Sequence, residues 1–168
     1  MDEFALLRRI IKVLDEHENL RNHVKLVGDS LSDYEARGNV RKAQEDWEPV
    51  QSDDEAQEME RLRKTFLVLE TGLQNHFTLE EELLPPLIGD FLTRALLIEH
   101  GRIKDGIKKV KSSITGMAEV GLTRGEFLSR DSELRQLMEN LRSLIDSHAQ
   151  REDSILFMLK IVLAEKTG

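Results

Sequence analysis

Apolar residues recur along this chain at intervals of three and four positions, which is the period of an amphipathic α-helix. Four segments show the pattern, at approximately residues 3–36, 54–85, 88–119 and 127–165. No segment shows the strict alternation of apolar and polar positions that is typical of a half-buried β-strand. The pattern therefore predicts an all-α protein in which four long helices form one domain over residues 1–168.

Residues that start or stop a helix mark the boundaries of these segments. Pro85 and Pro86 are expected to end the second helix, because proline lacks a backbone N–H and clashes with the preceding turn. Thr123 or Ser129 is expected to cap the fourth helix. The polar stretch between the first two helices, approximately residues 39–55, is expected to form either a loop or a short extra helix. The other two connections are short, which predicts an antiparallel up-down-up-down four-helix bundle.

The apolar face of each helix contains one histidine where Leu, Ile or Val would otherwise stand, and two faces also contain a glutamate four residues later. These residues are His17, His76, Glu80, His100, His148 and Glu152. Residues four apart share a helix face, so each His–Glu pair points the same way. Six ionisable groups in one core would threaten the net stability of a domain unless something compensated for their burial. A cation bound by all of them provides that compensation.

The positions of the histidines along the helices support one shared metal site in the core. With a rise of about 1.5 Å per residue, an antiparallel bundle brings the four histidines to nearly the same level. Imidazole and carboxylate ligands without thiolate suit iron, manganese or zinc. Six ligands are too many for one tetrahedral zinc ion. Two octahedral ions that share the glutamates use the whole set and leave an open position.

Four sequence strings together carry an ordered motif of H, HxxxE followed by proline, H, and HxxxE. They are Asp15–Leu20, His76–Pro85, Ile98–Ile103 and His148–Asp153. In this motif the chain resembles the hemerythrin-like (HHE) cation-binding family, and the resemblance extends over all four helices. It implies a non-haem centre of two iron ions, joined as Fe–O–Fe or Fe–OH–Fe, with the six residues named above as ligands. It also implies a function in binding or sensing O₂, NO or iron, or in iron–sulphur cluster repair.

One position differs from the oxygen-carrying members of that family. Carriers have a second histidine one turn after the third-helix ligand, and Lys104 stands there in this chain. The difference argues against reversible O₂ carriage and favours a sensor, a repair protein or an iron-handling domain. A water or Glu81 is expected to complete the coordination.

The other polar residues near the motifs are interpreted as solvent-exposed. His23 lies about 240° around the helix from His17 and is excluded from the site. The acidic residues beside the motifs are most simply a solvated face, and accepting the free N–H of a ligating imidazole is the less favoured alternative. They are Glu16, Glu18, Glu81, Glu82 and Glu99.

Composition narrows the classes of function further. The chain has 33% charged residues and a net charge of −8, which disfavours a nucleic-acid partner. Cysteine is absent, which excludes disulfides, thiolate metal sites and cysteine nucleophiles. No apolar stretch of about 18 residues and no signal-peptide pattern is present, so we expect no membrane association and a cytoplasmic location.

Three classes of function remain. The favoured one is a module that binds or senses O₂, NO or iron at an open iron position, and signalling by it would need a separate protein partner. The second is a di-iron redox enzyme, for example one that reduces NO or peroxide, or a protein that supplies iron for cluster repair. No catalytic residue is assigned for it from the sequence. The third is a helical interaction protein whose buried polar groups pair with one another without metal.

Overall fold

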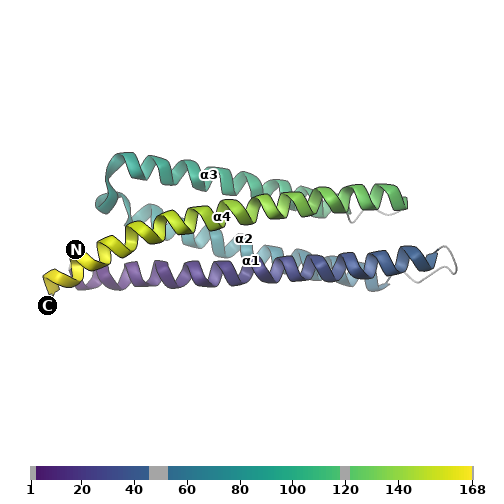
Figure 1. Ribbon diagram of the computed structural model, residues 1–168, viewed down its shortest axis with the longest axis horizontal. Coiled ribbons are helices and arrows are strands. Elements are labelled where there is room, and N and C mark those ends of the chain that lie inside the picture. The colour runs from purple at the N-terminus through teal and green to yellow at the C-terminus, as the bar shows by residue number, and fades with distance from the viewer. Residues whose placement is uncertain (1–2, 46–52, 118–121, 168) are drawn as a thin grey trace.

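The computed structural model describes residues 3–45, 53–117 and 122–167 of the chain. These ranges contain no strand and form four helices: α1 (Glu3–Glu45), α2 (Asp53–Leu83), α3 (Pro85–Met117) and α4 (Arg124–Thr167). Figure 1 shows the helices extended along one long axis, with both chain termini at the same end. The prediction of an all-α protein is confirmed.

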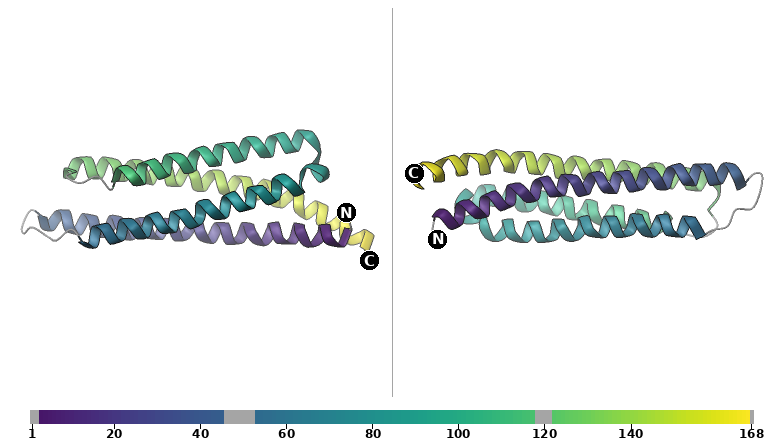
Figure 2. Two further views of the ribbon diagram at one scale, coloured as in Figure 1. Left: turned by 180° about the vertical axis from the view of Figure 1, so that it is seen from behind. Right: turned by 90° about the horizontal axis from the view of Figure 1, so that it is seen from below.

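The helices pack as a ring of four. The backbones of α1 and α3 each lie beside those of α2 and α4, and among the described residues the backbones of the diagonal pairs do not come close to one another. In the two views of Figure 2, each helix runs in the direction opposite to the helix before it. This is the up-down-up-down bundle that the short connections predict. None of the four helices, over the described residues, is long and apolar enough to cross a membrane.

The predicted end of the first helix is wrong. α1 continues to Glu45 instead of ending near residue 36, so residues 39–45 of the polar stretch are helical. Arg, Lys, Ala, Gln and Glu are frequent in this segment, and their high helix propensity extends a helix even where no apolar face continues. The rest of the connection, residues 46–52 with Trp47, lies outside the described residues.

The turn between α2 and α3 is tighter than predicted. Only Leu84 separates the two helices, and its N–H donates to the carbonyl oxygen of Glu80 (2.9 Å). Pro85 opens α3, where its missing N–H costs no hydrogen bond. After one turn, Gly89 interrupts the helix with φ 74° and ψ 171°, a region that glycine reaches without steric cost. The helix then continues in a new direction.

α4 begins with a reciprocal cap. The hydroxyl of Thr123 accepts the backbone N–H of Glu126 (3.2 Å), and the carboxylate of Glu126 accepts the backbone N–H of Thr123 (2.8 Å). This capping box satisfies two backbone donors that the helix itself leaves unpaired. Thr123 is therefore the cap, and Ser129 lies inside the helix.

A layer of buried polar side chains divides the apolar interior into two clusters. The larger core consists of Leu20, Val24, Val27, Leu31, Tyr34, Met59, Leu62, Phe66, Leu69, Leu73, Phe77, Ile103, Ile107, Val110, Ile114, Met117, Phe127, Leu134, Met138, Leu141 and Ile145. The smaller core, toward the end that holds the termini, consists of Leu6, Ile10, Val13, Leu83, Leu84, Leu96, Leu156 and Leu163. The polar layer between them is the candidate site.

Candidate metal centre

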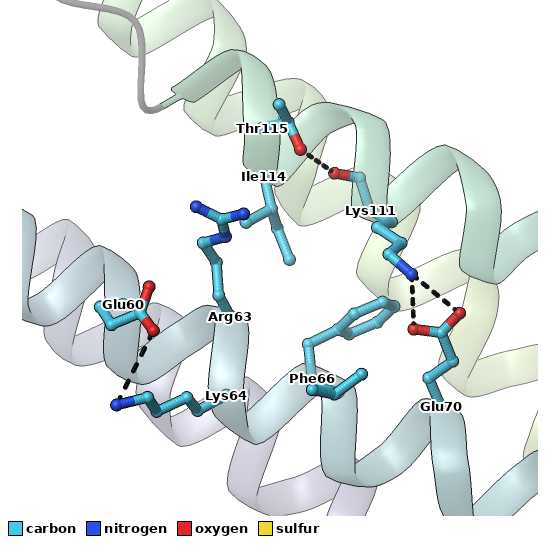
Figure 3. Close-up of a pocket in the computed structure, with 9 residues that line it drawn as sticks. Glu60, Arg63, Lys64, Phe66, Glu70, Lys111, Ile114 and Thr115 are labelled. Carbon is cyan, nitrogen blue, oxygen red and sulfur yellow. Dashed lines mark hydrogen bonds and ion pairs between the residues drawn. The ribbon is translucent and has the colours of Figure 1, made fainter.

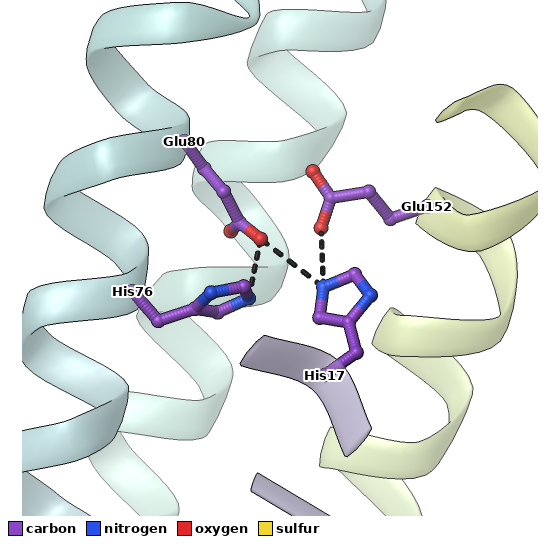
Figure 4. Close-up of side chains that lie close together, drawn as sticks. All are labelled: His17, His76, Glu80 and Glu152. Atoms are coloured by element: carbon purple, nitrogen blue, oxygen red, sulfur yellow. Dashed lines mark hydrogen bonds and ion pairs between the residues drawn. The ribbon is translucent and has the colours of Figure 1, made fainter. Parts of the chain in front are cut away.

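The six residues that interrupt the apolar faces come together in this polar layer. They are His17 from α1, His76 and Glu80 from α2, His100 from α3, and His148 and Glu152 from α4, and none is more than 4% exposed. Figure 4 shows four of them converging from α1, α2 and α4. His23 lies outside this six-residue cluster, and its Nδ1 is instead 2.7 Å from the carbonyl oxygen of Asn19.

Glu80 lies at the centre of the cluster, and each of its oxygens faces a different pair of histidines. Oε1 is 3.2 Å from Nε2 of His17 and also contacts Nε2 of His76. Oε2 is 3.1 Å from Nε2 of His100 and 3.6 Å from Nε2 of His148. A carboxylate with its oxygens divided in this way is placed to bridge two cations, as in di-metal carboxylate bundles.

Glu152 joins the two pairs from the opposite side. Its Oε2 is 3.3 Å from Nε2 of His17 and 3.4 Å from Nε2 of His148. These atoms lie at ion-pair distance from one another, but among the described residues neither oxygen of Glu152 makes a well-aligned hydrogen bond, and neither does Nε2 of His76 or His148. Unpartnered polar atoms are costly in a protein interior and uncommon there. Cations within the cluster would satisfy all of them.

The donor atoms separate into two groups that share one residue. Donor atoms of His17, His76, Glu80 and Glu152 lie within 4.8 Å of one another, as do those of Glu80, His100 and His148. Imidazole nitrogens and carboxylate oxygens are suitable ligands for first-row transition metals. The geometry therefore fits metal ions on both sides of Glu80.

Each of the four cluster histidines is also held from outside the cluster by a carboxylate of another helix. The contacts to histidine Nδ1 are Glu16–His76 (3.0 Å), Glu81–His100 (2.8 Å), Glu99–His148 (3.0 Å) and Asp153–His17 (2.6 Å). We call Glu16, Glu81, Glu99 and Asp153 the outer carboxylates. Each helix supplies one to the next helix, and α4 closes the ring on α1. A proton donated from Nδ1 to the carboxylate leaves the Nε2 lone pair directed at the cluster.

Every outer carboxylate is paired in turn with a basic side chain. The pairs are Lys12–Glu16 (3.7 Å), Lys104–Glu81 (3.4 Å), Arg151–Glu99 (2.6 Å) and Arg21–Asp153 (2.7 Å). The charges of this outer ring cancel one another. The charge inside the layer is therefore set by the two inner glutamates, by the protonation of the cluster histidines and by any bound cations.

The outer ring corrects the interpretation of the acidic residues beside the motifs. Glu16, Glu81 and Glu99 contact imidazoles and are not simply a solvated face, whereas Glu18 and Glu82 are exposed as interpreted. Sequence reasoning missed Asp153 altogether. A signal was present, because each outer carboxylate directly precedes a cluster histidine or directly follows a cluster glutamate. One residue turns a helix by about 100°, which directs the neighbouring side chain toward the next helix.

Lys104 is part of the outer ring. Its Nζ contacts Glu81 and lies 5.5 Å from the ring centroid of Phe77. The Phe77 ring stacks on the imidazole of His100 with centroids 3.9 Å apart. Because Glu81 is directed at Nδ1 of His100, it faces away from the cluster. The expectation that Glu81 completes the coordination is therefore wrong, which leaves a water as the expected additional ligand.

When no cation is bound, the close contacts in the cluster raise the pKa values of His17 and Glu152 and lower the pKa of Glu80. Burial lowers the pKa of His17, but contacts with Glu152, Glu80 and Asp153 outweigh burial and raise this pKa to about 10. Burial acts to raise the pKa of Glu80, but contacts with the four histidines hold it well below its usual range. Burial and the nearby charge of Glu80 raise the pKa of Glu152 in spite of its contact with His17. Metal ligands must be deprotonated, so a bound cation would displace protons from this layer.

The fold and the site define a helical bundle with a buried His/Glu group able to bind metal. The chain belongs to the hemerythrin family, because the model of the hemerythrin HHE cation binding domain matches residues 8–159. This range contains all six residues of the cluster. Comparisons with curated proteins and with solved structures give no significant match.

Proposed function

We propose that the six-residue cluster holds two iron ions and that the centre binds a small diatomic ligand, O₂ or NO, as a gas- or iron-sensing module. The observation that supports this most directly is the position of Glu80, whose oxygens face two separate pairs of histidines. One ion would be held by His17 and His76, and the other by His100 and His148. Glu80 and Glu152 would be shared. Two iron ions, when bound, supply a redox-active centre with an open coordination position.

The protein's own side chains orient and enclose this centre. The outer carboxylates hold every imidazole with Nε2 directed inward, which fixes both ring orientation and tautomer. The two apolar cores keep bulk water away from both sides of the layer. A ligand would therefore meet a pre-oriented site of low dielectric constant.

A binding or sensing role is favoured over a redox enzyme by the pairing of the acidic groups around the cluster. The outer carboxylates each contact a basic side chain. Burial acts to raise the pKa of Glu81, but contact with His100 lowers it. Burial likewise acts to raise the pKa of Asp153, and contact with His17 lowers it. Such carboxylates are poor proton donors near neutral pH. The proposal includes a cytoplasmic setting and a separate protein partner that responds to the centre.

Iron quantitation and an absorption spectrum of freshly purified protein test the proposal. After expression with added iron we expect about two irons per chain and near-ultraviolet charge-transfer absorption in the oxidised form. Stopped-flow mixing of the reduced protein with NO or O₂ should then change this spectrum. Zinc alone, or less than roughly half an iron per chain, would contradict the di-iron assignment.

Matched histidine variants test which residues hold the metal. His76→Ala removes a donor from the cluster and should reduce metal content sharply. His23→Ala changes a histidine that lies outside the cluster and should leave metal content unchanged. Glu80→Gln, which keeps the size of the side chain but not its charge, should reduce the occupancy of both metal positions. An equal loss of metal in the His23 variant would disprove the residue assignment.

A further inference from the structure

A cavity of about 100 Å³ lies against the cluster, between the beginning of α3 and the later part of α4. Its walls are mainly apolar and include Leu84, Ile88, Leu92, Leu96, Ile155 and Leu156. His148 and Glu152 also line it, and they are almost fully buried, so they mark its inner end. Leu92 (46% exposed) and Arg151 (58% exposed) mark its outer end. The cavity therefore extends from the surface to the edge of the candidate metal centre.

The shape of the α2–α3 turn creates this space. Figure 1 shows the beginning of α3 standing away from α4. The single turn before Gly89 places Ile88, next to Leu84, on one wall of the cavity. A continuous helix through Gly89 would direct this turn elsewhere.

A second pocket differs from this cavity in position and in chemistry. Figure 3 shows a pocket of about 270 Å³ between α2 and α3, bordered by charged side chains such as Arg63 and by the Lys111–Glu70 ion pair (2.9 Å). None of its lining residues belongs to the six-residue cluster or to the outer carboxylates. A ligand in that pocket would not reach the metal centre.

The volume and the walls of the α3–α4 cavity limit what it can hold. About 10–15 Å³ suffices for one water, and a dry apolar cavity of about 150 Å³ binds benzene or xenon. The cavity lies between these limits. Glu99 and Arg151 in the lining pair with each other, and the apolar side chains that form most of the walls offer a water or an ion few hydrogen bonds. A small uncharged molecule therefore fits best.

One side chain connects the cavity directly to a metal-site histidine. Glu99 lines the cavity, holds Nδ1 of His148 at 3.0 Å and pairs with Arg151 at 2.6 Å. A molecule in the cavity would thus contact the side chains that position His148 and Glu152.

We infer that the α3–α4 cavity is a binding site for a small, uncharged, apolar molecule of diatomic size beside His148 and Glu152. Its role as the route by which O₂ or NO reaches the centre rests on the proposed function. The binding site itself does not, because it depends only on the shape and polarity of the cavity.

Xenon is the probe for the cavity, since it reports apolar space without metal chemistry. In crystals of the full chain under xenon pressure, metal-free and iron-loaded, we expect a xenon atom in contact with Leu96 and Leu156. Ala95→Phe places a ring at an exposed lining position and should remove this xenon, and Ala95→Leu is the milder version of the same change. Ala164→Phe adds the same ring at an exposed α4 position outside the lining and should retain it. Absence of xenon from the wild-type cavity would overturn the inference, and so would xenon at unchanged occupancy in both Ala95 variants.

Ligand kinetics test the route. In the iron-loaded protein, Ala95→Phe should lower the NO association rate constant roughly tenfold at unchanged iron content, while Ala164→Phe should not change it. An unchanged rate in a variant that has lost the xenon site would show that ligands reach the centre elsewhere. If iron-loaded wild-type protein binds neither NO nor O₂, the proposed function fails, and the xenon result still decides whether the cavity is a binding site.

Discussion

The two apolar cores on either side of the cluster differ in how completely the bundle encloses them. The larger core contains aromatic side chains that are almost fully buried, among them Tyr34, Phe66 and Phe127. The smaller core is aliphatic. On the helix segments that form it, Phe91 is 91% exposed and Phe157 is 52% exposed.

The irregular features of the bundle lie at the end with the smaller core. The interruption at Gly89 and the α3–α4 cavity are both found there. The larger core is spanned by regular helices. We infer that the larger core supplies most of the folding free energy, while the end with the smaller core gives access to the site. Segments with few buried contacts open most readily, and functional openings are drawn from them.

Metal removal should produce the largest difference in stability between the two ends of the bundle. A ligand present at about 1,000 times its Kd stabilises the native state by roughly 4 kcal/mol, so the chelated protein should melt well below the loaded protein. It should stay largely helical, because the larger core contains none of the cluster residues. Circular dichroism melts with and without chelator measure the difference. Hydrogen exchange should show lost protection around Leu84, Leu96 and Leu156 and retained protection around Leu62, Ile107 and Leu134.

Two outcomes would contradict this comparison. An unchanged melting temperature after confirmed metal loss would mean that the polar layer satisfies itself without metal. Equal loss of protection at both ends would mean that the two cores unfold as one unit.

Truncating one buried leucine in each core should show a smaller difference. Leu134 in the larger core and Leu156 in the smaller core are both 0% exposed. Leu→Ala substitutions cost about 2–5 kcal/mol, depending on how far the site can collapse. In the metal-free protein we expect Leu134→Ala near the upper end of that range and Leu156→Ala near the lower end, because Leu156 already borders a cavity. Urea denaturation of both variants measures the costs, and equal values would remove the distinction between the cores.

Removing an outer carboxylate should weaken metal binding without unfolding either core. Asp153→Asn keeps the shape of the side chain but removes the charge that faces Nδ1 of His17 and pairs with Arg21. Loss of such a partner typically costs 10–100-fold in metal affinity. Glu18→Gln, at an exposed acidic position one residue from His17, is the matched control and should have no effect. Competition with a chromophoric chelator measures both variants, and wild-type affinity in Asp153→Asn would show that the outer contact has no role in binding.

The smallest predicted effect is the release of protons on metal binding. With its pKa raised to about 10 in the metal-free fold, His17 is protonated at pH 8, and metal binding must remove that proton. We expect release of about one proton or more per chain at pH 8, measured with an indicator dye during metal addition. Release should decrease toward pH 10. In the metal-free protein, the same raised pKa stabilises the fold fully below the ordinary value of 6.5, and this contribution is lost as pH rises toward 10. No proton release at pH 8 would show that His17 is already neutral.

Much of the fold and the inner part of the site could be predicted because both depend on local spacing. The apolar period of each helix identifies its buried face, and His17, His76, His100 and His148 each interrupt such a face. The end of α1 could not be predicted in this way, because helix propensity extends it beyond its apolar face. Gly89 was missed as an interruption, since a glycine alone does not reveal the φ that it adopts.

The sequence by itself determined the number of helices, their buried faces and the residues of the polar layer, because periods of three and four positions already set which side chains share a helix face. Only the tertiary structure decided which nitrogen of each imidazole faces inward. The contact between Asp153 and His17 joins side chains 136 positions apart and depends on the relative height and rotation of α1 and α4. The outward turn of Lys104 toward Glu81 and the cavity between α3 and α4 depend in the same way on how helices pack. Helical periodicity determines on which face of its helix a side chain lies, and only the packing of the helices determines which residues of other helices that side chain contacts.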